Sequence, residues 1–277
     1  MTWDVVAAVL AAAVAHAVWN ALVRGRTGDA LIASTGLSAT WALLGWPLVL
    51  LAGPLPPEAI GPVCGSAAIH VVYFTLLTLA YRSGELSLVY PIARGVPPVL
   101  VALGSGALIG ETVAPLGVVG IGLVATGVLL LGPRGRAGGR AVGLALGCAV
   151  CTAAYTLLDG VGVRASGDAF AYISWLVALQ GTAFAIGSIG FGGRPLARRV
   201  WEGRRVAAVS GVISAAGYGA ALWAMTHAPV AAVAALRETS VLFAVILGTA
   251  MLGDPFGVRR AVGAAVVTIG AVFLRFA

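Results

Sequence analysis

The chain consists of long apolar runs, separated only by short breaks of glycine, proline and charged residues. Such a run predicts a membrane-spanning helix, because about 20 residues cross the hydrocarbon core of a bilayer. The runs are too uniform in hydropathy for barrel strands, in which apolar and polar residues would alternate. We therefore predict ten spanning helices, over residues 3–23, 30–52, 62–81, 86–110, 113–132, 141–159, 169–191, 206–226, 229–252 and 257–276.

Composition favours the same fold class, an all-α polytopic membrane protein. Of the 277 residues, 60% are apolar and 10% are charged, whereas soluble domains average about 45–50% apolar and about 25% charged residues. A soluble fold of this size could not bury so much apolar surface. Ten helices would occupy about 200 residues and leave about 77 for loops, which excludes a sizeable soluble catalytic or nucleic-acid-binding domain. Three cysteines are too few for a secreted disulfide scaffold.

The net charge of +7 depends on arginine, because the chain contains no lysine. Most arginines lie at the ends of apolar runs rather than in one patch, which indicates membrane topology. Those that follow the odd-numbered predicted helices are Arg24, Arg26, Arg82, Arg134, Arg136, Arg140, Arg194, Arg198, Arg199, Arg204, Arg205, Arg259 and Arg260. The opposite side holds only Arg164 and Arg275. By the positive-inside rule, we expect a multi-pass protein of the cell membrane with both termini outside.

The two halves of the sequence repeat each other. A shift of 143 residues pairs Arg94 with Arg237, Gly110 with Gly253, Glu111 with Asp254, Gly120 with Gly263 and Gly127 with Gly270. Near the N-terminus, a shift of 139 residues pairs His16 with Tyr155 and Asn20 with Asp159. We therefore expect two five-helix repeats, residues 1–132 and 141–277, joined by a basic linker over residues 133–140. Because five is odd, the repeats would be inverted, as in secondary transporters whose substrate site lies between them.

Several stretches of the sequence resemble one branch of the EamA-type drug/metabolite transporters. They are His16-Ala-Val-Trp-Asn20, Tyr90-Pro-Ile-Ala-Arg-Gly-Val-Pro-Pro98 running to Ile109-Gly-Glu111, and the second-half echo Leu236-Arg-Glu238 running to Leu252-Gly-Asp254. The resemblance implies a ten-helix carrier of amino acids or other small metabolites, many such carriers being exporters. It also implies a central cavity lined by the predicted helices 3–23, 62–81, 86–110, 141–159, 206–226 and 229–252. Members of this size commonly keep both termini in the cytoplasm, so the arginine distribution departs from the family pattern.

Arg94 and Arg237 lie about eight residues into their predicted helices, roughly 12 Å deep at 1.5 Å per residue. A charge at that depth is costly, so each guanidinium should face protein or a wet cavity. One interpretation is contact with a substrate anion, since the planar guanidinium binds carboxylates bidentately. The alternative is a structural or gating ion pair, or a bond to carbonyls freed beside Pro91. Asp159 and Glu238 are the natural counter-charges.

Two pairs of polar residues are expected to face one cavity. His16 and Asn20 are four residues apart, as are Tyr155 and Asp159, so each pair shares one helix face. Asp159 there could bind a substrate ammonium group or carry a proton. The alternative is that Asp159 lies at a helix end in solvent. His16 could be a ligand or proton group, or could make an interhelical hydrogen bond.

Acidic and aromatic residues have open interpretations as well. Glu111 and Asp254 close two predicted helices, where they could pair with arginine as gates or cap the next helix. Aromatic rings at helical depth could stack on a substrate or only pack: Trp19, His70, Tyr73, Phe74, Tyr90, Tyr155, Tyr218 and Trp223. We expect Trp41 and Trp46 in the lipid-facing belt. Cys148-Ala-Val-Cys151 has no second cysteine pair and no nearby histidine, so we expect no metal site.

We predict a secondary active transporter, of exporter type, that moves a small polar metabolite by alternating access. The substrate would be amino-acid-like or an organic anion, and the proline-broken helix 86–110 would move. The other partners would be the bilayer and protons as coupling ion, with no cofactor, enzymatic activity or nucleic acid. The alternatives are a lipid-linked substrate flippase on the same scaffold and a non-transporting membrane subunit. The candidate substrate-binding residues are His16, Trp19, Asn20, Tyr73, Tyr90, Arg94, Tyr155, Asp159, Tyr218, Trp223, Arg237 and Glu238.

Overall fold

The structure is a computed structural model that describes residues 1–24, 29–82, 86–131, 138–252 and 257–276. Within these ranges the protein is all-helical and contains no strand. Its elements are α1 (Trp3–Arg24), α2 (Ala30–Ala52), α3 (Pro57–Arg82), α4 (Leu86–Gly95), α5 (Pro97–Gly104), the π-helix η1 (Ser105–Ile109), α6 (Pro115–Leu131), α7 (Gly139–Ser166), α8 (Ala169–Glu202), α9 (Arg204–Met225), α10 (Val230–Arg237), α11 (Ser240–Leu252) and α12 (Val258–Phe276). Eight helical segments of the described chain are long and apolar enough to cross a membrane, which makes the protein multi-pass.

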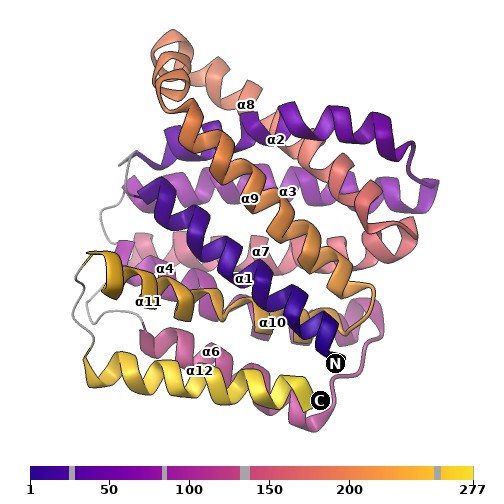
Figure 1. The fold of residues 1–277 in the computed structure, drawn as a ribbon, viewed down its shortest axis with the longest axis vertical. Coiled ribbons are helices and arrows are strands. Elements are labelled where there is room, and N and C mark those ends of the chain that lie inside the picture. The colour runs from indigo at the N-terminus through magenta and orange to yellow at the C-terminus, as the bar shows by residue number, and fades with distance from the viewer. Residues whose placement is uncertain (25–28, 83–85, 132–137, 253–256, 277) are drawn as a thin grey trace.

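The helices pack side by side in one bundle, and both termini lie at the same end of it (Figure 1). We call this the terminus end; there the Met1 amino group donates a hydrogen bond to the carbonyl of Arg275 at 3.1 Å. The other end is the arginine end, where α8 finishes at Glu202 and where α9 and α12 begin. Helix α1 begins at the terminus end, and α9 begins at the arginine end. The direction of each helix therefore tells which end of the bundle a given residue is nearer to.

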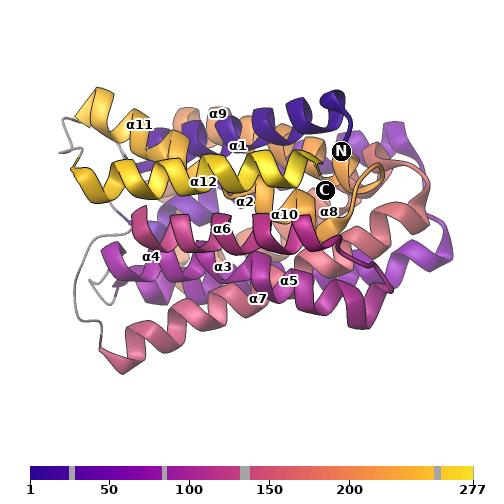
Figure 2. The ribbon, with the colours of Figure 1, turned by 90° about the horizontal axis from the view of Figure 1, so that it is seen from below.

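Helix pairing relates the two halves of the chain. The closest pairs are α2 with α8, α6 with α12, α3 with α7, and α1 with α9. If each helix is replaced by its counterpart in the other half, the pair α3–α7 becomes the pair α9–α1. The pairs α2–α8 and α6–α12 remain the same. Figures 1 and 2 both show α6 and α12 side by side, and in Figure 1 the two form the lower edge of the bundle. Each pair therefore joins one half of the chain to the other.

Glycines bring α6 and α12 into close contact. A β-carbon on Gly127 would lie 2.9 Å from the carbonyl oxygen of Gly263, and one on Gly263 would lie 3.1 Å from that of Gly127. Gly120 and Gly270 meet in the same reciprocal way, at 3.0 and 2.9 Å. Small residues at such spacing let helix backbones approach closely in lipid. The four glycines are those that the 143-residue shift pairs, so the contact repeats itself when the halves are exchanged.

Two of the predicted helices are broken. The segment 86–110 is interrupted at Val96, directly before Pro97 and Pro98, because proline lacks the N–H that continues a helix. It continues as α5 and the π-helix, and it ends at Gly110 in the left-handed region with φ of 71°. The segment 229–252 breaks after Arg237, where no proline is present, and resumes at Ser240.

Three predicted helix limits were wrong. The helix predicted over 141–159 continues to Ser166, because Gly160 and Gly162 leave space for side chains packed against them, and it ends at Gly167 with φ of 67°. The helix predicted over 62–81 starts at Pro57, and the helix predicted to end at 191 continues past a kink at Gly193. Residues 133–137 of the expected linker lie outside the described residues, as do Arg26, Arg134, Arg136, Gly253 and Asp254.

Candidate substrate-binding site

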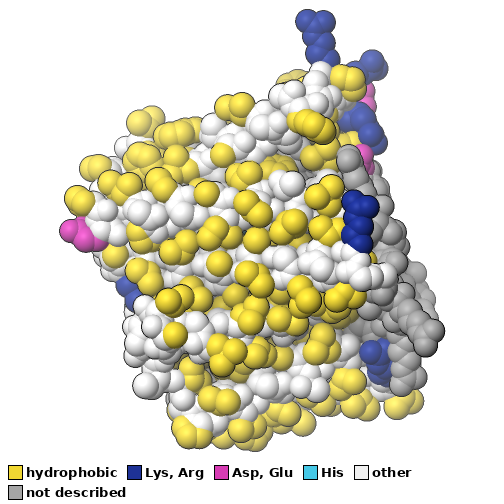
Figure 3. Space-filling view, turned by 180° about the vertical axis from the view of Figure 1, so that it is seen from behind, with side chains coloured by type: hydrophobic (Ala, Val, Ile, Leu, Met, Phe, Trp, Pro, Cys, Tyr) yellow, Lys and Arg dark blue, Asp and Glu magenta, His cyan; other side chains and the backbone are white. Residues whose placement is uncertain are grey.

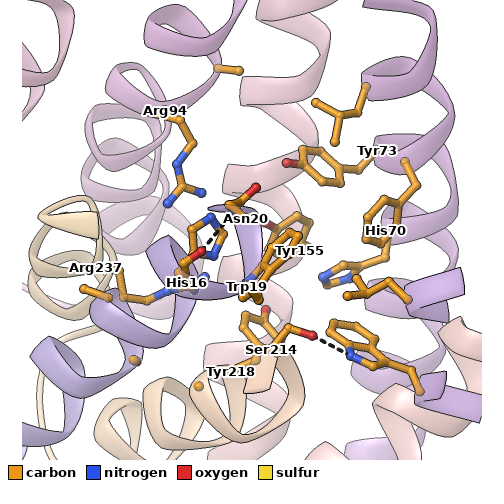
Figure 4. A pocket seen from close by; sticks show the side chains of 18 residues that line it. His16, Trp19, Asn20, His70, Tyr73, Arg94, Tyr155, Ser214, Tyr218 and Arg237 are labelled. Atoms are coloured by element: carbon orange, nitrogen blue, oxygen red, sulfur yellow. Dashed lines mark hydrogen bonds between the residues drawn. The ribbon is translucent and has the colours of Figure 1, made fainter. Parts of the chain in front are cut away.

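A cavity of about 100 Å³ lies within the bundle, between α1, α2, α3, α4, α7, α9 and α10 (Figure 4). This volume gives room for several water molecules. Its lining residues on α3 lie in the half of that helix nearer the arginine end, whereas Tyr155 on α7 and Tyr218 on α9 lie in the halves nearer the terminus end, so the cavity lies near the middle of the bundle's depth. All helices implied by the family resemblance contribute, and α2 is an additional wall.

Most of the predicted site residues line this cavity. Its walls include His16, Trp19, Asn20, Tyr73, Arg94, Tyr155, Tyr218 and Arg237. Glu238, Asp159 and Trp223 do not line the cavity. The side chain of Tyr90 lies outside the described part of the structure.

Arg94 is paired with an acidic residue from the other half of the chain. Its Nε lies 2.9 Å from Oε2 of Glu238, and its Nη2 donates to the hydroxyl of Ser240 at 2.9 Å. Arg94 and Glu238 are 6% and 4% exposed. A pair this deeply buried needs both partners, because an isolated buried charge is strongly unfavourable. The contact joins α4 to the break between α10 and α11.

Arg237 differs from Arg94 although the two occupy equivalent sequence positions. Its guanidinium lies over the ring of Tyr218, with 4.9 Å from Cζ to the ring centroid, in cation–π geometry. No acidic side chain among the described residues forms an ion pair with Arg237. The cavity is therefore lined by one arginine in a buried ion pair and by one arginine that makes a cation–π contact but no ion pair with the described residues.

Asp159 lies directly behind the cavity wall. It is fully buried, so the alternative that placed it in solvent at a helix end was wrong; α7 continues for seven residues beyond it. The hydroxyl of Tyr172 donates to its Oδ1 at 3.0 Å, and the hydroxyl of Tyr218 donates to its Oδ2. Tyr218 thus contacts Arg237 with its ring and Asp159 with its hydroxyl.

Stacked rings form one wall of the cavity. His70 stacks on Tyr155 with 3.8 Å between centroids and meets Tyr218 edge-on at 5.8 Å. Its Nδ1 lies 2.9 Å from the carbonyl oxygen of Ser66, which fixes the ring on α3. On α1, the His16 ring meets Trp19 edge-on at 5.1 Å. A planar or apolar portion of a ligand could stack on these rings.

Comparisons with known proteins identify the family and agree with the fold. Residues 139–276 match the EamA-like transporter family. The chain belongs to this family. Among curated proteins, none matches the sequence. A solved structure described as "Crystal structure of protein" is similar at 17% identity with a TM-score of 0.71, over 97% of this chain and 98% of that chain; at this identity the likeness shows the fold alone.

Two tryptophans of this EamA-like transporter, Trp41 and Trp223, lie elsewhere than the sequence predicted. Trp41 was expected in the lipid-facing belt but is buried and lines the cavity, and its Nε1 donates to Ser214 Oγ at 2.8 Å. The prediction failed because α2 packs between α8 and α9 and offers this face to protein. Trp46 is 43% exposed, as a belt residue would be. Trp223 does not line the cavity; its ring lies 4.5 Å from that of His227 in a tilted arrangement.

At the terminus end of the EamA-like fold, Glu111 joins three helices. One carboxylate oxygen lies 2.6 Å from Arg164 Nη1 at the end of α7, and the other accepts from the backbone N–H of Val230, the first residue of α10, at 2.9 Å. Arg164 also donates to the carbonyls of Met225 and Ala228 at 2.8 and 3.0 Å. Glu111 therefore pairs with an arginine and also caps a helix, but the capped helix is α10 rather than α6, the next helix in the sequence. These bonds tie the end of α7 to the end of α9 and the start of α10 at the terminus end.

Proposed function

We propose that this EamA-like transporter is a secondary active carrier of exporter type that moves a small amino-acid-like molecule or organic anion by alternating access. The observation that carries the proposal is Arg237, a guanidinium on the cavity wall without an acidic partner in the described chain. Arginine binds a carboxylate through two parallel hydrogen bonds, which makes it suited to holding such a group. The rings of Tyr155 and His70 would hold the rest of the molecule.

Alternating access is supported by the relation between the halves. The reciprocal helix pairs and glycine contacts are those expected of two inverted five-helix repeats, residues 1–132 and 141–277, in a ten-helix carrier. The bonds of Glu111 link α7 and α10 at the terminus end. In the proposed cycle these bonds would form in one state and break in the other, so that access to the cavity alternates between the two ends. The broken segments α4–α5 and α10–α11 are the elements that would bend between the states.

Proton coupling is proposed at Asp159. This carboxylate is fully buried, and among the described residues the hydroxyls of Tyr172, Tyr218 and Ser66, rather than cations, donate hydrogen bonds to it. Tyr218 connects it to the cavity, because the same side chain supports Arg237. Binding of a substrate anion at Arg237 would change the electrostatic field at Asp159 through this shared ring. Asp159→Asn should therefore abolish uphill accumulation and spare exchange of substrate across the membrane.

Counterflow in proteoliposomes tests the substrate class. The purified protein is reconstituted, and exchange of labelled amino acids, organic anions and cations is measured. We expect carboxylate-bearing solutes to exchange, with exchange lost in Arg237→Gln. Arg237→Lys should raise KM by about tenfold or more, because an ammonium replaces two directed bonds by a point charge.

The matched control is Arg140→Gln, which removes the same charge from an exposed position at the start of α7. It should exchange substrate as the parent does. Carboxylate exchange that is unchanged in Arg237→Gln, or a protein that exchanges only cations, would contradict the proposal.

A further inference from the structure

Helix α8 is longer than one membrane span requires. Residues 169–192 of this helix run for about 36 Å at 1.5 Å per residue, which exceeds the thickness of about 30 Å that a span must cross. The backbone then turns at Gly193, whose φ of 62° is in the left-handed region that glycine adopts without strain. The following segment to Glu202 remains helical and projects at the edge of the bundle (Figure 1).

This segment is held against the bundle by one face only. Leu196 is buried, and Arg199 lies 3.4 Å from Asp29, the residue that caps the start of α2 at the arginine end. The contact with Asp29 fixes the segment at the depth where α2 begins. Phe191 and Trp201 remain 90% and 67% exposed. Large exposed rings at this depth are typical of membrane interfaces, where tryptophan is enriched.

The exposed face of the segment is strongly basic. Arg194, Arg198, Arg199, Arg204 and Arg205 are all exposed. Arg198 pairs with Glu202, and Arg199 pairs with Asp29. Arg204 lies over the ring of Trp201, with 4.4 Å from Cζ to the centroid, and donates to its carbonyl at 2.9 Å. Arg194, Arg204 and Arg205 form no ion pair with any described acidic residue, so no carboxylate neutralises these three charges. Figure 3 shows these basic side chains gathered along one edge of the molecule, at the top where α8 ends.

We propose that residues 191–205 form a binding site for the phosphate headgroups of anionic phospholipids in the bilayer that this chain spans. The arginines that no carboxylate neutralises would bind the phosphates, while Phe191 and Trp201 would insert beside the upper acyl chains. Clusters of four to eight basic residues directly beside a spanning helix attract anionic lipid. Arginine binds phosphate through two directed hydrogen bonds. The role of these arginines in membrane orientation requires only their charge and no exposed tryptophan beside them. Lipid binding would therefore be a function in addition to orientation.

Quenching of Trp201 fluorescence by brominated lipid tests this site. The full-length protein is reconstituted in vesicles of equal parts phosphatidylcholine and phosphatidylglycerol, with one lipid or the other brominated near the headgroup. The Trp201 signal is the difference between the parent and Trp201→Phe. We expect brominated phosphatidylglycerol to quench it several-fold more effectively than brominated phosphatidylcholine. This preference should decrease with added salt, because ions screen exposed charges.

The double variant Arg194→Gln/Arg205→Gln should lower the preference for phosphatidylglycerol by about fivefold or more, since each basic residue near the surface contributes to lipid binding. The matched control is Arg259→Gln/Arg260→Gln, which removes two arginines at the same end of the bundle from the start of α12 and should retain the preference. Equal quenching by both lipids in the parent would overturn the proposal. A preference that is the same in the parent and in Arg194→Gln/Arg205→Gln would overturn it as well.

Discussion

At the scale of single residues, Arg94 and Glu238 depend on each other. The two side chains are buried 2.9 Å apart, with Ser240 as a further partner of Arg94. Arg94→Gln should destabilise the protein by about 3–5 kcal/mol, because it leaves a buried carboxylate without its cation. Arg94→Gln/Glu238→Gln should recover most of this loss. Thermal unfolding in detergent measures both, and Arg237→Gln is the control because Arg237 pairs with no described acid.

An unfolding temperature equal to that of the parent in Arg94→Gln would show that Glu238 finds other partners. The same outcome would return Arg94 to the role of a substrate contact, which the sequence had left open.

Tyr218 and Tyr172 provide a second residue-scale prediction. Each donates one hydrogen bond to Asp159, but only Tyr218 reaches the cavity and Arg237. Tyr218→Phe keeps the ring beneath Arg237 and removes the hydroxyl, so it should lower proton-driven accumulation by about tenfold or more while exchange continues. Tyr172→Phe removes its own hydrogen bond to Asp159 and should leave the ratio of accumulation to exchange unchanged. Uptake into vesicles with and without a pH gradient measures this ratio; equal effects of both variants would exclude a route through Tyr218.

Much of the candidate site could be predicted from residue type and spacing. Intramembrane charge identified Arg94 and Arg237, and the four-residue spacing identified His16 with Asn20. Spacing could not distinguish the two arginines, because their difference depends on Glu238, which follows Arg237 and has no counterpart after Arg94 in the sequence. Trp41 was missed because a tryptophan that hydrogen-bonds inside a bundle and one at a lipid interface have the same sequence signal.

At the scale of helices, the contact between α6 and α12 depends on glycine. A β-carbon on Gly127 would lie 2.6 Å from Val267 Cγ2 and 2.8 Å from the Val267 backbone nitrogen. Gly127→Ala should therefore destabilise the protein by about 1–3 kcal/mol, the usual effect of overpacking. Gly122→Ala on the same helix is the control, because no atom lies within 4 Å of the added carbon. Equal unfolding temperatures of the two variants would contradict the close packing.

Glu111 should control the opening of the terminus end. Glu111→Gln retains an oxygen that can accept from Val230 but removes the charge opposite Arg164. In a chain with Cys64, Cys148 and Cys151 replaced, Ser214→Cys provides a thiol on the cavity wall. An impermeant thiol reagent applied from the terminus end should label it about fivefold faster in Glu111→Gln, given up to about 1 kcal/mol for a partly exposed pair.

Glu58→Gln is the control for this labelling experiment, because it removes an exposed acid near the same end of the bundle. Labelling that is as slow in Glu111→Gln as in Glu58→Gln would mean that other contacts close this end.

The elements were predicted better than their limits. Hydropathy located the apolar segments, because a span needs a fixed length of apolar residues. The break at Val96 was indicated by its prolines, whereas the break after Arg237 has no local signal and coincides with the buried pair of Glu238. The extension of α7 to Ser166 was missed because Gly160 and Gly162 suggest a helix end, although here they make space for Val230 and Tyr172.

At the scale of the whole molecule, the arginine distribution predicts its orientation. Among the described residues, the arginine end holds Arg194, Arg198, Arg204 and Arg259, and the terminus end holds Arg164 and Arg275. By the positive-inside rule we expect the terminus end to face outward. A C-terminal reporter that fluoresces only in the cytoplasm should stay dark, and a fusion to an enzyme active only outside should work. A bright reporter would reverse the assignment and restore the usual arrangement of the family.

The hydrogen bond from the Met1 amino group to the carbonyl of Arg275 places the two ends of the described chain next to each other. Proteins whose termini lie close together tolerate circular permutation, in which the chain begins at a different residue. A circular permutant cut within residues 132–137 and joined from residue 277 to residue 1 would have the second half first, with the same contacts between the halves. Because each half crosses the membrane an odd number of times in the proposed architecture, the new termini would emerge on the opposite face. The order in which the halves are synthesised is thus separable from the way they pack.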